Sequence, residues 1–400
     1  MGTDLRDTRL ARASCALAIF SALLGSTAPS PLYPLYLEEL HLGKGMGTAI
    51  FSTYAAGTML ALLIFGKIGG RVSDLRRIIV PGLLMTALGA VIFAVAHSLP
   101  VLLVGRFLNG FGTGAITGMA SAALFAIYPP DMRRVAAVTA TVAFTGGAAG
   151  GPLLSSLAIW LDLAPTVTPF VVIVILAVLA AIGLILSHWP RKGISAPLPE
   201  SPQGTEQMDM PLFLLACLVV CVAWMLGSVL MALGTDLGLT VYALHSPALA
   251  GLVPAIFQLF GGLGQYLSGR YPAQRAILAG LLGMTVAQIV LIAAIPGAVG
   301  AVLIALMPVC GFFYGAAFVG SLGAANRAST PATREAYISR FYMAGYLANS
   351  VPTVIVGYLS DIFSLKSAFL GYSIVIIVLA IAGILFLRHL EADPWRQRQR

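Results

Sequence analysis

The chain has 400 residues, of which 59% are hydrophobic and only 10% are charged, and its mean hydropathy is +0.94. Soluble domains carry about a quarter of their residues as charged side chains, so this composition excludes an ordinary globular protein and predicts one that crosses a membrane repeatedly. The formal net charge of +8 is scattered over many short segments. That scatter excludes a nucleic-acid-binding module, whose basic residues would gather on one domain.

Apolar runs of roughly 20 residues, each long enough to cross a hydrocarbon layer of about 30 Å as a helix, recur along the chain. The first run has the basic flank and small terminal residues of a cleavable leader, but its Leu24-Gly25-Ser26 recurs as Leu226-Gly227-Ser228, which favours a retained span. We therefore expect an all-α membrane protein with 12 transmembrane helices. They are placed near residues 13–35, 46–66, 78–98, 100–127, 135–161, 167–187, 211–235, 247–268, 276–296, 299–323, 339–360 and 367–388.

The basic residues are divided unevenly between the two sides of these spans. With the N-terminus placed inside, 20 of the 23 Lys and Arg fall inside, two fall outside (Lys44 and Lys366) and one, Arg106, lies within a span. The positive-inside rule then predicts that both termini are cytoplasmic and that the chain lies in the cytoplasmic (inner) membrane.

The two halves of the sequence follow one plan. A 16-residue interval from Gly66 to Gly82 contains Arg77, and an equal interval from Gly264 to Gly280 contains Arg275 at the same place. Later matches keep nearly the same offset, such as Gly110-Phe111 with Gly311-Phe312. We expect six spans repeated once in the same orientation.

This plan divides the chain into three parts. We expect a six-helix bundle at 1–187, a cytoplasmic linker at 188–210 that is rich in Pro and Ser, and a second six-helix bundle at 211–400.

A loop dense in glycine and basic residues joins the second and third spans. Its single acid, Asp74, has four basic neighbours, Lys67, Arg71, Arg76 and Arg77. An aspartate here can pair with arginines or with a helix N-terminus, and glycines let helices approach closely. Interfacial anchoring by the charges alone is the alternative.

The six-plus-six plan, this loop and the long central linker resemble the major facilitator superfamily over essentially the whole chain. The family's loop motif, G-x-x-x-D followed by basic residues, is matched from Gly70 to Asp74, whereas a second frame that begins at Gly66 keeps the spacing to Gly82 and loses the acid. The resemblance implies a conformational latch on the cytoplasmic side. Its residues here would be Gly66, Gly70, Arg71, Asp74, Arg76 and Arg77.

Arg106 is the only charged residue placed well inside a span. A charge there costs at least a few kcal/mol and by default marks function; a structural arginine that caps backbone carbonyls is the alternative. With Gly110 and Gly114 it resembles a fourth-helix motif of many proton-linked exporters.

The fifth span carries Gly147, Gly151 and Pro152, which resemble a signature of efflux members of the family. Small residues pack closely and the proline frees a carbonyl, so we expect a hinge. Ser155 and Ser156 stand where the family has glycines, and glycine-rich packing alone is the alternative.

The first span ends in a segment with Pro29, Pro31 and Pro34, which predicts that the helix loosens there. Tyr33 and Tyr36 in this segment fit an interfacial belt better than a ligand site.

The resemblance implies that spans 1, 4, 7 and 10 line a central cavity. Ser21 and Met225 are possible wall residues, and for every candidate ordinary helix packing is an equal alternative. The predicted substrate-binding residues are Arg106, Asn109, Thr113, Ser26, Thr27, Trp224, Ser228 and Tyr314.

All 15 acidic residues are placed in loops or at span ends, with Asp236 and Asp361 on the outside. In this superfamily exporters of cations typically hold a buried carboxylate, because an unpaired cation in a low-dielectric site is very costly. We therefore expect neutral or weakly anionic substrates. Proton coupling stays open, through Glu38, Glu39 or Asp361, or through ionisation of the substrate itself.

The sequence thus predicts a secondary active antiporter that exports small amphipathic compounds by alternating access. A sugar or metabolite importer of the same fold and a non-transporting receptor or scaffold are the alternatives. No His, Asp or Glu spacing indicates an enzyme, and the four cysteines are expected to be packing residues. Expected partners are a small-molecule substrate, the lipid bilayer and, as an open alternative, protons; we expect a monomer with no cofactor, metal or nucleic acid.

Overall fold

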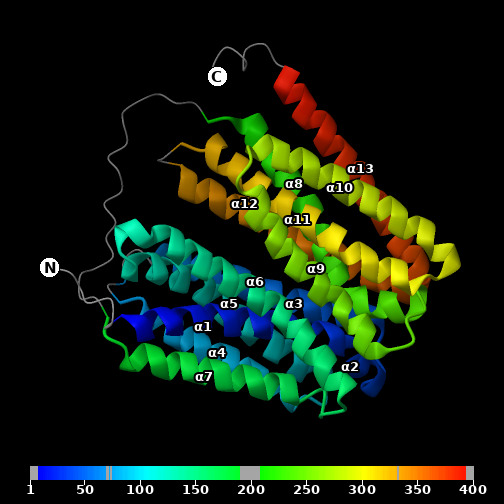
Figure 1. Ribbon diagram of the computed structural model, residues 1–400. Helices are drawn as coiled ribbons and strands as arrows, with labels where there is room; N and C mark the ends of the chain where they lie inside the picture. Colours follow the sequence, from blue (N-terminus) through cyan, green and yellow to red (C-terminus); the bar gives the residue numbers. More distant parts are fainter. Residues whose placement is uncertain (1–7, 69–71, 73, 190–207, 331–332, 393–400) are drawn as a thin grey trace. The chain divides into compact units, whose positions relative to one another are not determined.

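The computed structural model of the chain describes residues 8–68, 72, 74–189, 208–330 and 333–392. Within these residues every regular element is helical, and the chain falls into two compact units (Figure 1). The first unit comprises residues 8–42, 49–189 and 247–255, and the second comprises 43–48, 208–246 and 256–392. Of the predicted linker, residues 190–207 lie outside the described residues.

The long helices follow the predicted spans closely. In the first half they are α1 (Arg9–Thr27), α2 (Tyr33–Glu39), α3 (Lys44–Ile68), α4 (Arg76–Ala94), α5 (Leu99–Ile127), α6 (Arg133–Trp160) and α7 (Thr168–Leu186). In the second half they are α8 (Met210–Asp236), α9 (Pro247–Ser268), α10 (Ala273–Ala294), α11 (Gly300–Ala328), α12 (Arg334–Ile362) and α13 (Leu365–Ala392).

Eleven spans in the described part of the chain are long and apolar enough to cross a membrane, with α1 and α2 counted as one. The exception is α12, which has 29 residues but carries polar side chains such as Arg340 and Asn349 along its length. All twelve predicted segments are therefore helical, and the all-helical membrane fold is confirmed.

The predicted loosening at the end of the first span is confirmed. The helix α1 ends at Thr27, a short 3-10 turn covers Ser30–Leu32, and α2 begins at Tyr33. The prolines cause this break because they lack an N–H and cannot continue the helical hydrogen bonds. The belt prediction for Tyr33 and Tyr36 is wrong: they are only 1% and 2% exposed and pack inside the first unit.

The seventh span is longer than the predicted 211–235. Beyond α8 the backbone continues as a π-helical turn, Leu237–Val241, so the span runs from Met210 to Val241. Asp236 therefore lies within a span and is buried, at 5% exposed. The prediction that this span ends at residue 235 is wrong, because the π turn carries the helix past Asp236.

The two halves repeat the same helix packing. In the first half α1 packs on α5, α6 and α7, and α4 packs on α5 and α7. In the second half α8 packs on α11, α12 and α13, and α10 packs on α11 and α13. The structure thus confirms that six spans are repeated once.

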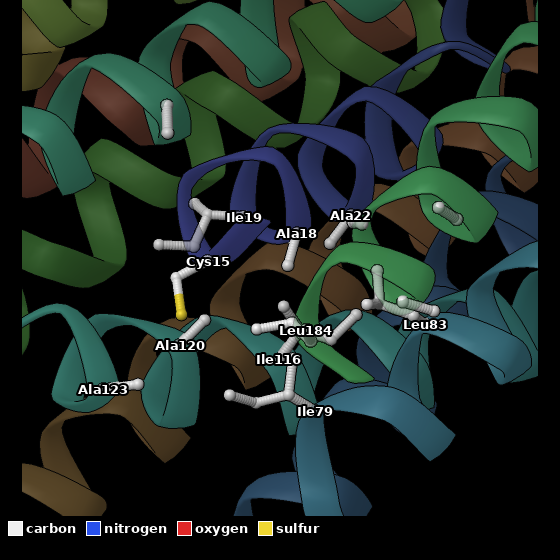
Figure 2. Packing of buried hydrophobic residues seen from close by; sticks show 14 of the residues in the cluster. Cys15, Ala18, Ile19, Ala22, Ile79, Leu83, Ile116, Ala120, Ala123 and Leu184 are labelled. Carbon is white, nitrogen blue, oxygen red and sulfur yellow. The ribbon is translucent and has the colours of Figure 1, made fainter. Parts of the chain in front are cut away.

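The core of the first unit forms where α1, α4, α5 and α7 meet (Figure 2). Small side chains, including Ala18 and Ala120, let α1 and α5 lie close to larger neighbours such as Ile79 of α4 and Leu184 of α7. Cys15 is fully buried in this cluster. Its place among alanines and aliphatic residues fits the expected packing role.

Glycines from the repeated motif bring helix backbones into contact at matching places. A methyl group added at Gly110 of α5 would collide with the carbonyl oxygen of Tyr54 in α3, and one added at Gly311 of α11 would collide with that of Phe257 in α9. Only glycine permits so close an approach. The sequence match between these positions therefore reflects one packing solution used twice.

Candidate functional site

The break after α1 leaves backbone carbonyls without helical partners in the middle of a membrane-spanning segment. Such groups must be satisfied within the protein, because lipid offers no hydrogen bonds. Two side chains from other helices do this: Arg106 Nη1 donates to the Ser26 carbonyl at 2.7 Å, and Ser155 Oγ donates to the Ala28 carbonyl at 2.7 Å.

Arg106 lies on α5, about 10 Å along the axis from the helix start, and is 1% exposed. Its guanidinium lies 4.7 Å from the ring centroid of Tyr54 and pairs with no carboxylate among the described residues. Aromatic faces stabilise a cation only partly. The first unit therefore holds a buried positive charge that its described residues do not neutralise.

Three polar groups in this region lack hydrogen-bond partners among the described residues. They are Arg106 Nε, Asn109 Oδ1 and the Tyr33 hydroxyl, which lies beside the guanidinium. Native structures leave few buried polar groups unpaired, and each one calls for an explanation. Together these groups offer a bound molecule two donors and an acceptor.

The other predicted contacts in the first unit are less available. The Thr113 hydroxyl donates to the Asn109 carbonyl at 2.9 Å, and the Thr27 hydroxyl donates to the Leu23 carbonyl at 3.0 Å. Ser26 contributes its backbone carbonyl, which accepts the hydrogen bond from Arg106. Sequence reasoning did not identify Tyr33 as a neighbour of Arg106. The available signal was that Tyr33 lies in the proline-rich end of the first span, where the helix was expected to break.

The predicted contacts in the second unit lie on α8 and α11. The indole of Trp224 meets Tyr346 edge to face at 4.9 Å and has no partner for its N–H among the described residues. Ser228 shares a hydrogen bond of 2.6 Å with Thr353 of α12, and Tyr314 lies 5.0 Å from Phe257. This half offers an aromatic surface rather than charges.

The predicted hinge residues lie where α6 packs on α1. A methyl group at Gly147 would collide with the Phe20 carbonyl, and one at Gly151 would collide with Thr27. Pro152 lies inside α6, and its carbonyl accepts a hydrogen bond from Ser156 Oγ at 2.8 Å. Of the two serines that replace the family's glycines, Ser155 satisfies a carbonyl at the break after α1, and Ser156 bonds within the continuous helix α6.

The predicted latch is described in part: Gly70 and Arg71 lie outside the described residues, and Gly66 is a backbone position of α3. Asp74 pairs with Arg76, whose Nη2 lies 2.9 Å from the carboxylate. Arg76 also donates through Nη1 to the carbonyls of Leu184 and Ser187 at the end of α7. The pair therefore ties the start of α4 to the end of α7 inside the first unit.

Burial acts to raise the pKa of the Asp74 carboxyl, but hydrogen bonds from Arg76 and the charges of Arg76 and Arg77 outweigh it and hold the pKa below its ordinary value. The pair is therefore charged at neutral pH. Its contribution to stability is lost only as the pH falls through this lowered value.

We expect Asp74→Asn to slow transport by at least about fivefold and to change substrate affinity little, because the loop would then hold its conformation less firmly. Initial transport rates over a range of substrate concentrations measure both quantities. Asp131→Asn, a change at an exposed acid of another loop, is the matched control. Normal turnover in Asp74→Asn would show that the charges of this loop only anchor the chain at the membrane surface.

A second ion pair involves the start of α3, which groups with the second unit. Lys44 Nζ lies 2.7 Å from Asp236, and the carboxylate of Asp361 accepts hydrogen bonds from the backbone N–H groups of Lys44 and Gly45 at 2.7 and 2.9 Å. A carboxylate at a helix N-terminus is stabilised by the helix dipole. The other oxygen of Asp236 has no partner among the described residues.

Two units with the same helix packing, built from apolar spans, define a polytopic membrane protein. The family model for the Major Facilitator Superfamily matches residues 15–296 and 212–400. The chain belongs to this superfamily.

Solved transporters share the fold. A bacterial homologue of the human lysosomal transporter Spinster, in an inward-facing and occupied conformation, matches with a TM-score of 0.77 at 17% identity over 97% of each chain. The peptide transporter POT matches with 0.78 at 14% identity over 97% of this chain and 96% of that one.

The nucleoside transporter NupG matches with a TM-score of 0.75 at 12% identity. The match covers 94% of this chain and 100% of the NupG chain. A comparison with curated proteins found no match. At these identities the likeness establishes the fold, which is that of a transporter.

Proposed function

We propose that this protein is a secondary active exporter of small amphipathic compounds, neutral or weakly anionic, that works as a monomer by alternating access in the cytoplasmic membrane. Family membership and the transporter fold support the general class. The uneven distribution of basic residues supports cytoplasmic termini. The glycines and proline of α6 support efflux, since they resemble a signature of exporting members.

The observation that carries the substrate class is the buried guanidinium of Arg106. It is 1% exposed and has no carboxylate partner among the described residues. A cationic substrate near it would meet a like charge in a medium of low dielectric, which is strongly unfavourable. A carboxylate or a polar neutral group would instead meet unused donors on Arg106 and Tyr33.

The second unit supports the amphipathic character of the substrate. Trp224 lies among Tyr346, Tyr342 and Phe318. Aromatic side chains bind apolar groups through large contact areas with little loss of conformational freedom. The second unit thus offers an apolar surface suited to an amphipathic molecule.

We also propose that Asp236 couples export to protons, in place of the acids Glu38, Glu39 and Asp361 that the sequence suggested. Asp236 is 5% exposed, and one of its oxygens is unpartnered within the described residues. Loss of its contact with Lys44 during the cycle would leave the Asp236 carboxylate without a charged partner among the described residues.

Transport into everted membrane vesicles tests these proposals. We expect uptake of uncharged chloramphenicol or weakly anionic salicylate that depends on a proton gradient, and no uptake of ethidium. Asp236→Asn should retain exchange of bound substrate and lose its dependence on the gradient. Asp131→Asn, at an exposed acid, is the control.

Gradient-driven ethidium uptake would contradict the assigned substrate class. Uptake of sugars or other metabolites into right-side-out vesicles would instead support the importer alternative. Full gradient dependence in Asp236→Asn would exclude that residue as the proton site.

A further inference from the structure

Two fully buried polar side chains in the second unit lack hydrogen-bond partners among the described residues. Gln288 of α10 and Ser373 of α13 are each 0% exposed. The oxygen and nitrogen of the Gln288 amide and the hydroxyl of Ser373 are all unpaired within the part of the chain that the structure describes. Inside a membrane such groups must be satisfied within the protein, because lipid offers no hydrogen bonds. Neither residue belongs to the latch, the hinge or the predicted substrate contacts.

The helices that carry these two residues, α10 and α13, pack on each other. They run in opposite directions, because successive spans alternate and α13 is the third span after α10. Their register is fixed at Gly383, where an added methyl group would lie 3.0 Å from the side chain of Leu281. Two turns from this contact, Gln288 is level with Ile376 of α13, and Ser373 lies one turn further along α13.

Gln288 and Ser373 lie on the faces by which α10 and α13 meet. Each belongs to a buried row at the three- and four-residue spacing that defines one side of a helix. The row on α10 comprises Ile277, Leu281, Met284 and Gln288, and the row on α13 comprises Ser373, Ile376, Ala380 and Gly383. Since the Leu281 side chain reaches Gly383, the two rows face each other.

The first unit contains an apolar counterpart of this helix pair. In the repeat, Ala90 of α4 corresponds to Gln288, and Val174 of α7 corresponds to Ser373. These correspondences follow from the offsets of two matched pairs, Gly82 with Gly280 and Phe170 with Phe369. The helices α4 and α7 pack on each other as α10 and α13 do. Packing alone therefore does not require polar residues at these two positions, and the second unit has both.

A tyrosine contact confirms this alignment in the structure. The Tyr36 hydroxyl donates to the Phe93 carbonyl of α4 at 3.4 Å, and the Tyr242 hydroxyl donates to the Leu291 carbonyl of α10 at 2.9 Å. Phe93 and Leu291 are related by the same offset as Ala90 and Gln288. The two helix pairs are therefore equivalent in the fold and differ in the polarity of the two facing positions.

The unpaired groups suit a small neutral ligand. An amide offers both donors and an acceptor, and a hydroxyl donates and accepts. The sequence has no charged residue from Ala276 to Ala294 or from Ser367 to Leu387, so an ion would meet no opposite charge on these stretches, which is very costly at low dielectric. Water both donates and accepts, and a buried water typically makes about three hydrogen bonds to polar groups that are otherwise unpaired.

We propose that the second unit binds water between α10 and α13, and that the Gln288 amide and the Ser373 hydroxyl are its ligands. The offset of one turn between them, about 5 Å along the helix axes, is close to the span of two successive hydrogen bonds through a water molecule. The water takes the place of the apolar packing that Ala90 and Val174 provide in the first unit. This site is separate from the substrate site that contains Arg106 and does not rest on the proposed function.

Hydroxyl-radical footprinting of the full-length protein in detergent tests the proposal, with water enriched in heavy oxygen as the probe. X-rays form radicals from bound water, and these add the heavy oxygen to the nearest side chains. We expect labelling of Met284, which is 0% exposed and lies one turn before Gln288 in the same row. Phe93, an oxidisable side chain that is 2% exposed in the equivalent helix pair, should stay unlabelled. The double variant with Gln288→Leu and Ser373→Ala should lose the label on Met284.

Thermal unfolding of the same proteins separates a bound water from an amide that has no partner at all. Gln288→Leu and Ser373→Ala should each lower the unfolding temperature by about 2 °C or more, because each leaves the remaining group with one hydrogen bond fewer. The double variant should lose less than the sum of the two single losses, since both residues bind the same water. A higher unfolding temperature in Gln288→Leu would overturn the proposal, because removing a buried polar group without a partner stabilises a protein.

Two further outcomes would also overturn the proposal. If Met284 is unlabelled in the unchanged protein while the two single losses are coupled, Gln288 and Ser373 bond to each other directly and no water lies between them. If Met284 keeps its label in the double variant, the water does not depend on these residues. Should Gln288→Leu fail to fold, undiminished labelling of Met284 in a folded Ser373→Ala variant has the same consequence.

Discussion

Arg106→Gln should reduce transport on the order of 100-fold and leave the protein folded. The estimate follows from the cost of removing one partner of a buried charged hydrogen bond, about 2 to 5 kcal/mol. Stability should change little, because the variant loses one hydrogen bond to Ser26 and also removes a buried charge that lacks a carboxylate partner in the described residues. Transport rates and thermal unfolding of the purified protein measure the two effects.

Ser155→Ala is the control that separates binding from structure. Ser155 and Arg106 both satisfy carbonyls at the broken end of α1. If Arg106 only caps a carbonyl, the two variants should lose activity and stability alike. If Arg106 binds substrate, Ser155→Ala should be the less stable variant and the more active one. Arg106→Lys keeps the positive charge but loses the planar guanidinium. Its transport activity should lie between those of Arg106→Gln and the unchanged protein.

Gly110→Ala should destabilise the fold by about 3 kcal/mol or more, which is large compared with typical net stabilities. The new methyl group would collide with the backbone carbonyl of Tyr54, and a backbone cannot move aside as the end of a side chain can. The yield of monodisperse protein and its unfolding temperature report the effect.

Gly118→Ala is the matched change in the same helix. A methyl group at Gly118 meets nothing within 4 Å, and alanine is a better helix former than glycine by about 1 kcal/mol. We expect this variant to be as stable as the unchanged protein or slightly more so. Equal unfolding temperatures for Gly110→Ala and Gly118→Ala would show that the contact between α3 and α5 is not as close as described.

The sequence by itself determined the membrane fold, its repeat and the positions of most helices. Apolar runs must form helices in lipid because their backbone groups have no other partners, so length and hydropathy are sufficient there. The repeated glycines could also be recognised from the sequence. A close contact between helix backbones tolerates no residue other than glycine, as Gly110 and Gly311 show.

Only the tertiary structure decided which polar groups are satisfied. Asp74 had four basic neighbours in the sequence, and the structure pairs it with Arg76, whose guanidinium also reaches the end of α7. Tyr33 and Asp236 were placed at membrane surfaces by their position near span ends, yet both are buried. Their burial depends on a proline break and on a π turn, which change where a helix ends and which neighbours its side chains meet. Hydropathy is an average over some twenty residues, whereas hydrogen bonding and charge pairing are decided by individual contacts between segments far apart in the chain.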